Sequence, residues 1–192
     1  PEPGKMHEVE RFFYVAHSAI KAWNGTPAFD KVPKRLGLLS LKRHEAAAKN
    51  LIEQYKIPDK FALLAPVARG KHNGKEKNWP HFNELVAPLK EHGIEPIIFP
   101  SQREEDLAKQ ACPDATILPP TTLGNFAALA RRAQIVIAND SGVSHVAAAV
   151  GAKQITLVGV TDPARTSPWN PDALVLGKEG QWPSVEEVVS AL

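Results

Sequence analysis

The 192-residue sequence has little of what marks several large classes of protein. It holds one cysteine, Cys112, which excludes a framework of internal disulfides and fits a reducing compartment. No apolar run approaches the roughly 18 residues of a membrane span. The first residues, "PEPGKMHEVERFF", lack the basic, apolar and small-residue order of a signal peptide. We therefore expect a soluble, cytoplasmic chain.

The sequence also lacks an excess of charge of either sign. Lysine and arginine number 23, aspartate and glutamate number 21, and the net charge is +2. Proteins that bind nucleic acid through bulk charge are far more basic, so we expect no nucleic-acid partner and only a local basic site. The chain begins at Pro1 and has its only methionine at Met6. We expect it to be part of a longer protein.

Helical and strand patterns alternate along the chain. Residues 7–23 and 41–57 have helical patterns, and the segment 25–40 between them contains prolines and glycines and shows no sustained period. From residue 61 onward, short apolar runs alternate with helical stretches. The expected strands are 61–67, 95–100, 115–119, 134–138 and 154–160, and the expected helices are 80–92, 103–111, 123–132 and 142–150.

This alternation predicts the fold class. Strands that are apolar throughout and alternate with helices indicate a parallel sheet covered on both faces. We predict an α/β fold with a doubly wound, Rossmann-like parallel sheet in residues 60–192, preceded by two helices and a linker in residues 1–59. Ligands of such sheets lie outside the carboxyl ends of the strands, where the polar turns of this chain collect.

Several common motifs are missing from those turns. "GKHNGK" is not a Walker A loop, because three residues instead of four separate its glycines and Glu76 follows the lysine. No G-x-G-x-x-G follows a strand, so we expect no nicotinamide cofactor. The seven histidines are scattered without ligand spacing, so we expect no metal site. Ser141 and Ser144 lie in no G-x-S-x-G elbow, which argues against a nucleophilic serine.

Two turns leave alternatives open. The segment "ARGKHNGKEKNWPHF" is either a phosphate site or a solvated basic loop, and it holds Arg69, Lys71, Lys75 and Lys77. Glu104 lies at the start of the helical stretch 103–111. A carboxylate at this place interacts favourably with the helix dipole, and that interaction alone can account for its presence.

The most informative turn lies in "IVIANDSGVSHVAAAVGA", where an apolar strand passes into an alanine-rich helix through polar residues. A serine or aspartate at this place can serve as a helix cap and nothing more. His145, however, follows Ser141 by four residues, so we expect both side chains and the free amides of Gly142 and Val143 to face one point. Such a group favours an anion. A histidine that only packs in the helix is the alternative.

Three segments, "KNWPHFNELVAPL", "NDSGVSHVAAAVGA" and "LVGVTDPARTSPW", closely resemble the carboxyl-terminal half of the bacterial heptosyltransferases, glycosyltransferase family 9. The resemblance covers residues 60–192 well and "HEVERFF" more loosely. It implies the GT-B architecture, in which two Rossmann-like domains face each other across a cleft. Residues 60–192 would be the sugar-nucleotide-binding domain, and residues 1–59 the tail of the amino-terminal acceptor domain with linker helices.

The resemblance also implies an activity. Members transfer heptose with inversion from ADP-L-glycero-D-manno-heptose to the inner core of lipopolysaccharide, without a cofactor or a required metal. The general base and the lipid A-core acceptor site would lie in the amino-terminal domain, where an acceptor of this kind would bring the enzyme to the inner face of the inner membrane.

Site residues carry over from the matching motifs. Lys77, Ser141, Gly142 and His145 would hold the diphosphate, Glu104 would accept from ribose hydroxyls, and Asp140 would contact the transferred sugar or orient the turn. The implied donor-binding set is Arg69, Lys77, Glu104, Asp140, Ser141, Gly142 and His145, of which Lys77 and Asp140 would also be catalytic.

The sequence departs from the family pattern at two places. Val67 and Ala68 stand where some relatives have hydroxyl residues, and Val158 replaces the usual phenylalanine before Gly159. These departures leave the exact sugar open. The alternatives are another GT-B enzyme with a different sugar nucleotide, such as a UDP-sugar transferase or an epimerase, and a non-catalytic nucleotide-binding module.

Overall fold

A six-stranded parallel sheet forms the centre of the structure, a computed structural model that describes residues 6–192. Across the sheet the strands follow the order β5-β4-β1-β6-β7-β8. The strand order reverses at β1, because the chain first adds β4 and β5 on one side and then returns to add β6, β7 and β8 on the other. The strands are β1 (Phe61–Ala65), β4 (Glu95–Ile98), β5 (Thr116–Ile117), β6 (Ile135–Asn139), β7 (Gln154–Val158) and β8 (Leu174–Gly177).

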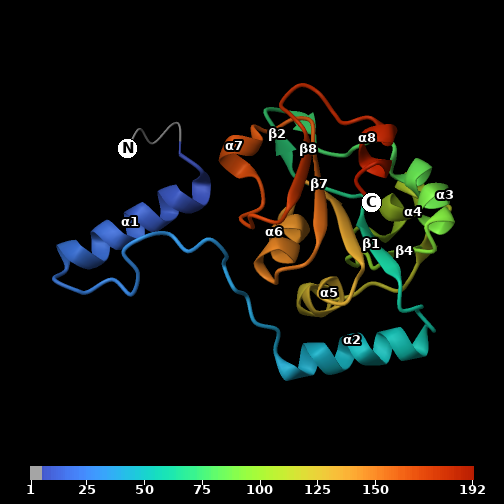
Figure 1. Ribbon diagram of the computed structural model, residues 1–192, viewed down its shortest axis with the longest axis horizontal. Coiled ribbons are helices and arrows are strands. Elements are labelled where there is room, and N and C mark those ends of the chain that lie inside the picture. The colour runs from blue at the N-terminus through green and yellow to red at the C-terminus, as the bar shows by residue number, and fades with distance from the viewer. Residues whose placement is uncertain (1–5) are drawn as a thin grey trace.

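Helices cover both faces of this sheet (Figure 1). One face packs against η1 (Phe82–Leu85), α3 (Val86–Glu91), α4 (Glu105–Ala111) and α8 (Val185–Val189). The other packs against α2 (Lys42–Gln54), α5 (Leu123–Ala130) and α6 (Gly142–Ala149). Within β1, Ala62 and Leu64 join the first cluster and Phe61 and Leu63 the second, since successive side chains of a strand point to opposite faces. The predicted fold class is confirmed.

Four parts of the structure were not expected from the sequence. The strand β8, the helix α8 and the one-turn helix of residues 163–166 were missed, and the basic loop forms a small hairpin of β2 (Lys71–His72) and β3 (Lys75–Glu76). Asn73 and Gly74 form the tip of the hairpin with φ angles of 50° and 77°. Positive φ at both central residues is what a two-residue hairpin turn of type I′ requires, and Asn-Gly satisfies it readily.

The helix α2 packs on α5, at the outside of the sheet domain (Figure 1). Ala48 of α2 is fully buried, and Nδ1 of His44 lies 3.1 Å from Oδ1 of Asn125. A Cβ atom at Gly124 would lie 2.3 Å from the His44 ring, so the glycine permits this close approach. Residues 42–54, which the sequence groups with the segment 1–59, therefore pack together with the sheet domain.

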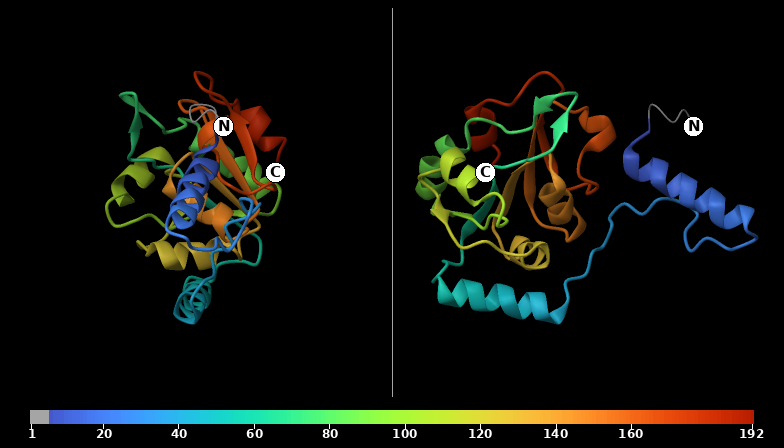
Figure 2. Two further views of the ribbon diagram at one scale, coloured as in Figure 1. Left: turned by 90° about the vertical axis from the view of Figure 1, so that its left-hand side faces the viewer. Right: turned by 180° about the vertical axis from the view of Figure 1, so that it is seen from behind.

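The helix α1 (Glu8–Ala22) stands away from the sheet domain (Figures 1 and 2). None of its residues is buried, and the polar contacts that tie it to the domain are made by His7 and Glu8. His7 caps the helix, and Nε2 of its ring lies 2.9 Å from the carbonyl oxygen of Ser167. Glu8 forms an ion pair of 3.1 Å with Arg165. No helix among residues 6–192 is long and apolar enough to cross a membrane.

The chain returns from α1 to α2 along an irregular segment, residues 25–41. Two hydrogen bonds and the ion pair of Arg35 with Asp172 hold this segment to the sheet domain. The indole Nε1 of Trp169 donates to the carbonyl oxygen of Pro33 at 2.7 Å. The backbone amide of Leu38 donates to the carbonyl oxygen of Ala149 at 2.8 Å. The short helix α7 (Pro163–Thr166) precedes Ser167 and Trp169, so this corner of the domain carries both the start of α1 and the linker.

Candidate functional site

A hollow of about 300 Å³ lies at the carboxyl ends of β1 and β6, next to the point where the strand order reverses. This is the place where open α/β sheets bind their ligands. Five of the predicted site residues meet there: Arg69, Lys77, Glu104, Ser141 and Gly142. The rest of the lining is Val67, Ala68, Gly70, Leu123 and Val143.

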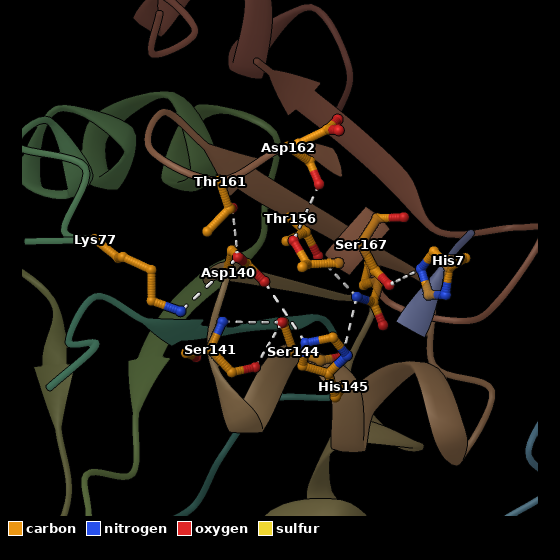
Figure 3. A network of polar contacts seen from close by, with 12 residues as sticks. His7, Lys77, Asp140, Ser141, Ser144, His145, Thr156, Thr161, Asp162 and Ser167 are labelled. Carbon is orange, nitrogen blue, oxygen red and sulfur yellow. Dashed lines mark hydrogen bonds and ion pairs between the residues drawn. The ribbon is translucent and has the colours of Figure 1, made fainter. Parts of the chain in front are cut away.

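Lys77 and Asp140 face each other at the edge of this hollow (Figure 3). The ammonium Nζ of Lys77 lies 3.8 Å from Oδ2 of Asp140, whose side chain is buried. The hydroxyl of Thr161 donates to the same oxygen at 2.6 Å. Burial raises the pKa of Asp140, but His145, Thr161 and the charge of Lys77 together outweigh it and hold the pKa below the ordinary 3.8. The carboxylate is therefore charged at neutral pH and holds the lysine in place.

His145 lies on the other side of that carboxylate. Its Nε2 is 3.6 Å from Oδ1 of Asp140, and the side chain is about half exposed. The sequence predicts that His145 and Ser141 face one point, whereas the structure places Ser141 on the hollow and His145 against Asp140. The two residues are one helical turn apart, and the imidazole of His145 contacts the buried carboxylate of Asp140 instead of lining the hollow.

At the start of α6, the buried hydroxyl of Ser141, a residue that lines the hollow, is left without a partner among the described residues. The hydroxyl of Ser144 caps the turn, because it accepts from the amide of Ser141 at 3.2 Å and donates to its carbonyl oxygen at 2.8 Å. A Cβ atom added at Gly142 would have no atom within 4 Å other than those of its chain neighbours and of its own helix backbone. The first turn of α6 thus opens into the hollow with its backbone accessible.

A second, narrower pocket of about 100 Å³ adjoins the hollow. Glu104 lines both spaces, and its Oε2 accepts from the hydroxyl of Ser101 at 2.5 Å. The walls of the narrow pocket are mostly apolar and come from β1, β4, α4, α5, α6 and the loops that follow β1, β4 and β5. They include Val67, Ile98, Phe99, Pro100, Thr121, Thr122, Leu123, Phe126 and Val143. The carboxylate of Glu104 thus lies between an apolar slot and a hollow that is lined by the basic residue Lys77.

Two residues of the site were missed from the sequence. Thr161 lies in a segment that was singled out for its resemblance, but no role was assigned to it. Asn139 directly precedes Asp140, and its fully buried amide contacts the loop that carries Lys77.

Residues 6–192 contain no group of three or more His, Cys, Asp or Glu residues arranged to hold a metal ion. The expectation of a metal-free reaction stays a prediction.

Comparison with known proteins places this geometry in context. The sequence model of glycosyltransferase family 9 (heptosyltransferase) matches residues 1–191. A lipooligosaccharide heptosyltransferase 2 of Haemophilus ducreyi is 27% identical over 184 residues, which are 88% of this chain and 51% of that protein. A lipopolysaccharide heptosyltransferase 1 of Escherichia coli is 30% identical over 122 residues, 57% of this chain and 38% of that protein. The chain spans about half, or less, of the length of the curated relatives it matches.

Solved structures have the same fold. A family 9 glycosyltransferase from Veillonella parvula superposes with a TM-score of 0.72 at 17% identity, over 99% of this chain and 55% of that one. The E. coli heptosyltransferase WaaC, solved with ADP, gives a TM-score of 0.54 at 27% identity, over 68% of this chain and 42% of that one.

Proposed function

This chain belongs to glycosyltransferase family 9, the heptosyltransferases, and from that premise we propose that it is the donor-binding part of an inverting heptosyltransferase. The donor would be ADP-L-glycero-D-manno-heptose and the acceptor the inner core of lipopolysaccharide. The general base and the acceptor site would lie in an amino-terminal domain that precedes residues 60–192, and the enzyme would work at the cytoplasmic face of the inner membrane. Relatives named as heptosyltransferases 1 and 2 support this assignment.

One observation carries the proposal: a lysine, an open helix start and a carboxylate line a single hollow at the switch point of the sheet. The diphosphate would lie between Lys77 and the first turn of α6, where the free amides and the hydroxyl of Ser141 can donate to it. Glu104 would accept from ribose hydroxyls, and the adenine would enter the apolar slot beyond it. The ADP bound to WaaC, a family 9 relative at 27% identity, supports the choice of nucleotide.

The proposed reaction requires stabilisation of the diphosphate as a leaving group. When the bond between the heptose and ADP breaks, negative charge develops on the leaving phosphate, and donors fixed in advance around it lower the barrier. Lys77 is fixed in this way, because the buried carboxylate of Asp140 holds its ammonium group and Thr161 holds that carboxylate. Asp140 therefore acts at least by orienting the lysine, and Arg69 adds charge at the rim of the hollow.

Calorimetric titration with ADP and adenosine tests the proposal. Lys77→Ala should weaken ADP binding by about 1.5–3 kcal/mol, the range for a hydrogen bond to a charged group, and should leave adenosine binding nearly unchanged. Lys75→Ala is the matched control. Lys75 is an exposed lysine of the hairpin that directly precedes Lys77 and does not line the hollow, so its replacement should change ADP binding little. Equal losses for ADP and adenosine in Lys77→Ala would mean that Lys77 does not contact phosphate.

Two further measurements separate the alternatives. Tighter binding of UDP or GDP than of ADP would assign the chain to another sugar nucleotide, and no binding of any nucleotide would contradict the donor role. Heptose transfer by these 192 residues alone would contradict the division of labour between the two domains.

A further inference from the structure

We propose that Asn139 is a positioning residue for Lys77. Its buried side-chain amide ties together the two ends of the loop that carries this lysine, and so sets where the ammonium group lies relative to Asp140 and α6. The inference rests on the proposed function, since it takes Lys77 to bind the diphosphate of the donor.

The amide of Asn139 reaches both ends of the loop. Asn139 is the last residue of β6 and is fully buried. Its Nδ2 donates to the carbonyl oxygen of Pro66 at 2.7 Å, and its Oδ1 accepts from the backbone amide of Trp79 at 2.9 Å. Pro66 follows β1 directly, and Trp79 ends the excursion of residues 67–78. One side chain thus closes the base of this excursion.

The loop has little else to hold its shape. Its hairpin consists of two-residue strands and is largely exposed, and an isolated two-stranded hairpin is marginally stable at best. Besides the exposed ion pair of Lys71 with Glu76 and the contact of Lys77 with Asp140, two further anchors lie at its base. Oδ1 of Asn78 accepts from the amide of Ala68 at 2.6 Å, and the buried indole of Trp79 donates to the carbonyl oxygen of Pro183 at 2.9 Å. Lys77 lies two residues before Trp79, so a shift of the Trp79 backbone is passed on to the lysine.

The two hydrogen bonds require an amide. The carbonyl oxygen of Pro66 needs a donor and the backbone amide of Trp79 needs an acceptor, and the asparagine side chain offers both at once. An aspartate could accept from Trp79 but could not donate to Pro66, and an apolar residue would leave both backbone groups buried without a partner. The neighbouring residue in the chain is Asp140, so the end of β6 supplies both the anchor of the loop and the partner of its lysine.

A double-mutant cycle with Lys77 tests the proposal on the intact chain. Asn139→Ala in the parent chain should weaken ADP binding about tenfold, because the misplaced lysine loses most of its contact with phosphate. The same substitution in a Lys77→Ala background should change ADP binding less than roughly twofold, since no lysine remains to be positioned. Adenosine binding should stay the same in all four proteins. Asn139→Ser, which keeps one of the two hydrogen bonds, should give an intermediate loss.

A core substitution separates positioning from general loss of stability. Leu129 is fully buried in α5 and lines neither the hollow nor the slot. Leu129→Ala should lower the melting temperature and leave ADP binding unchanged. If the Asn139 variants weaken ADP binding as strongly without Lys77 as with it, or weaken adenosine equally, the positioning role is overturned. If Lys77→Ala itself leaves ADP binding intact, the proposed function fails first and the positioning role with it.

Discussion

The helix α1 and the sheet domain contain similar apolar residues and use them in opposite ways. In the sheet, Phe61 and Leu63 are almost wholly buried, whereas Phe12 and Trp23 of the α1 region are 66% and 81% exposed. Helices of about 12–15 residues are marginal in water without packing, and α1 has 15 residues. Its support comes from the cap at His7, from the ion pair of Glu8 with Arg11, and from the contacts that His7 and Glu8 make with Ser167 and Arg165.

The comparison shows what an amphipathic pattern can and cannot indicate. The periodicity of residues 7–23 and that of residues 41–57 predict helices equally well, and both predictions are confirmed. Only α2 buries part of its apolar side, against α5, while Phe12, Tyr14 and Val15 of α1 remain exposed. The pattern therefore predicts a helix but not the surface that the helix packs on. Three experiments test how far the two regions differ in solution.

The largest difference should appear in the reactivity of cysteine. Cys112 is fully buried, and burial raises the pKa of its thiol to about 11. Val15 of α1 is 59% exposed, so Val15→Cys places a second thiol on the surface. We expect alkylation at position 15 to be at least ~1000-fold faster than at Cys112, because the buried thiol reacts only when the domain opens. Mass spectrometry of peptides gives both rates in one sample, and labelling in urea should make them equal.

A matched pair of phenylalanine truncations should give the next largest effect. Phe61→Ala removes a buried ring from β1 and should lower the free energy of unfolding by about 3–5 kcal/mol. Phe12→Ala removes an exposed ring from α1 and should change it by less than about 0.5 kcal/mol. Urea denaturation followed by circular dichroism measures both. A loss above about 1 kcal/mol for Phe12→Ala would mean that α1 packs in solution.

The smallest effect concerns the pH dependence of stability. The pKa of Glu8 is lowered, mainly by its hydrogen bond with Arg11, and that of Asp140 is lowered by His145, Thr161 and Lys77 despite its burial. A carboxyl group with a lowered pKa stabilises the fold above its ordinary pKa, and this contribution is lost as the pH falls through the folded value. Unfolding midpoints between about pH 5 and 3 should therefore fall less steeply for Asp140→Asn than for the parent chain. Glu8→Gln should change the slope less, because Glu8 is screened by solvent. A steeper slope for either variant would contradict these signs.

Local sequence was enough for much of the fold and for part of the site. The strands that are continuous apolar runs were predicted, whereas β8 was missed because Leu174–Gly177 is a short, half-exposed edge strand. The strand order had no local signal, since β1 pairs with β6, whose residues lie about 70 positions further along the chain. In the site, Ser141 and Gly142 were accessible to prediction because a helix start is a local feature. The contacts of Thr161 with Asp140 and of Asn139 with Trp79 join residues 21 and 60 positions apart, which no spacing rule reveals.

The attachment of α1 by one end gives it the mechanics of a lever. At a rise of 1.5 Å per residue, its 15 residues extend roughly 22 Å beyond the contacts of His7 and Glu8. A tilt of roughly 10° about those contacts therefore displaces the far end of the helix by roughly 4 Å. The fulcrum is the corner formed by Arg165 and Ser167, which continues the chain from the Thr161 that holds Asp140. The displacement produced by such a tilt is therefore largest at Trp23, the residue that ends the helix.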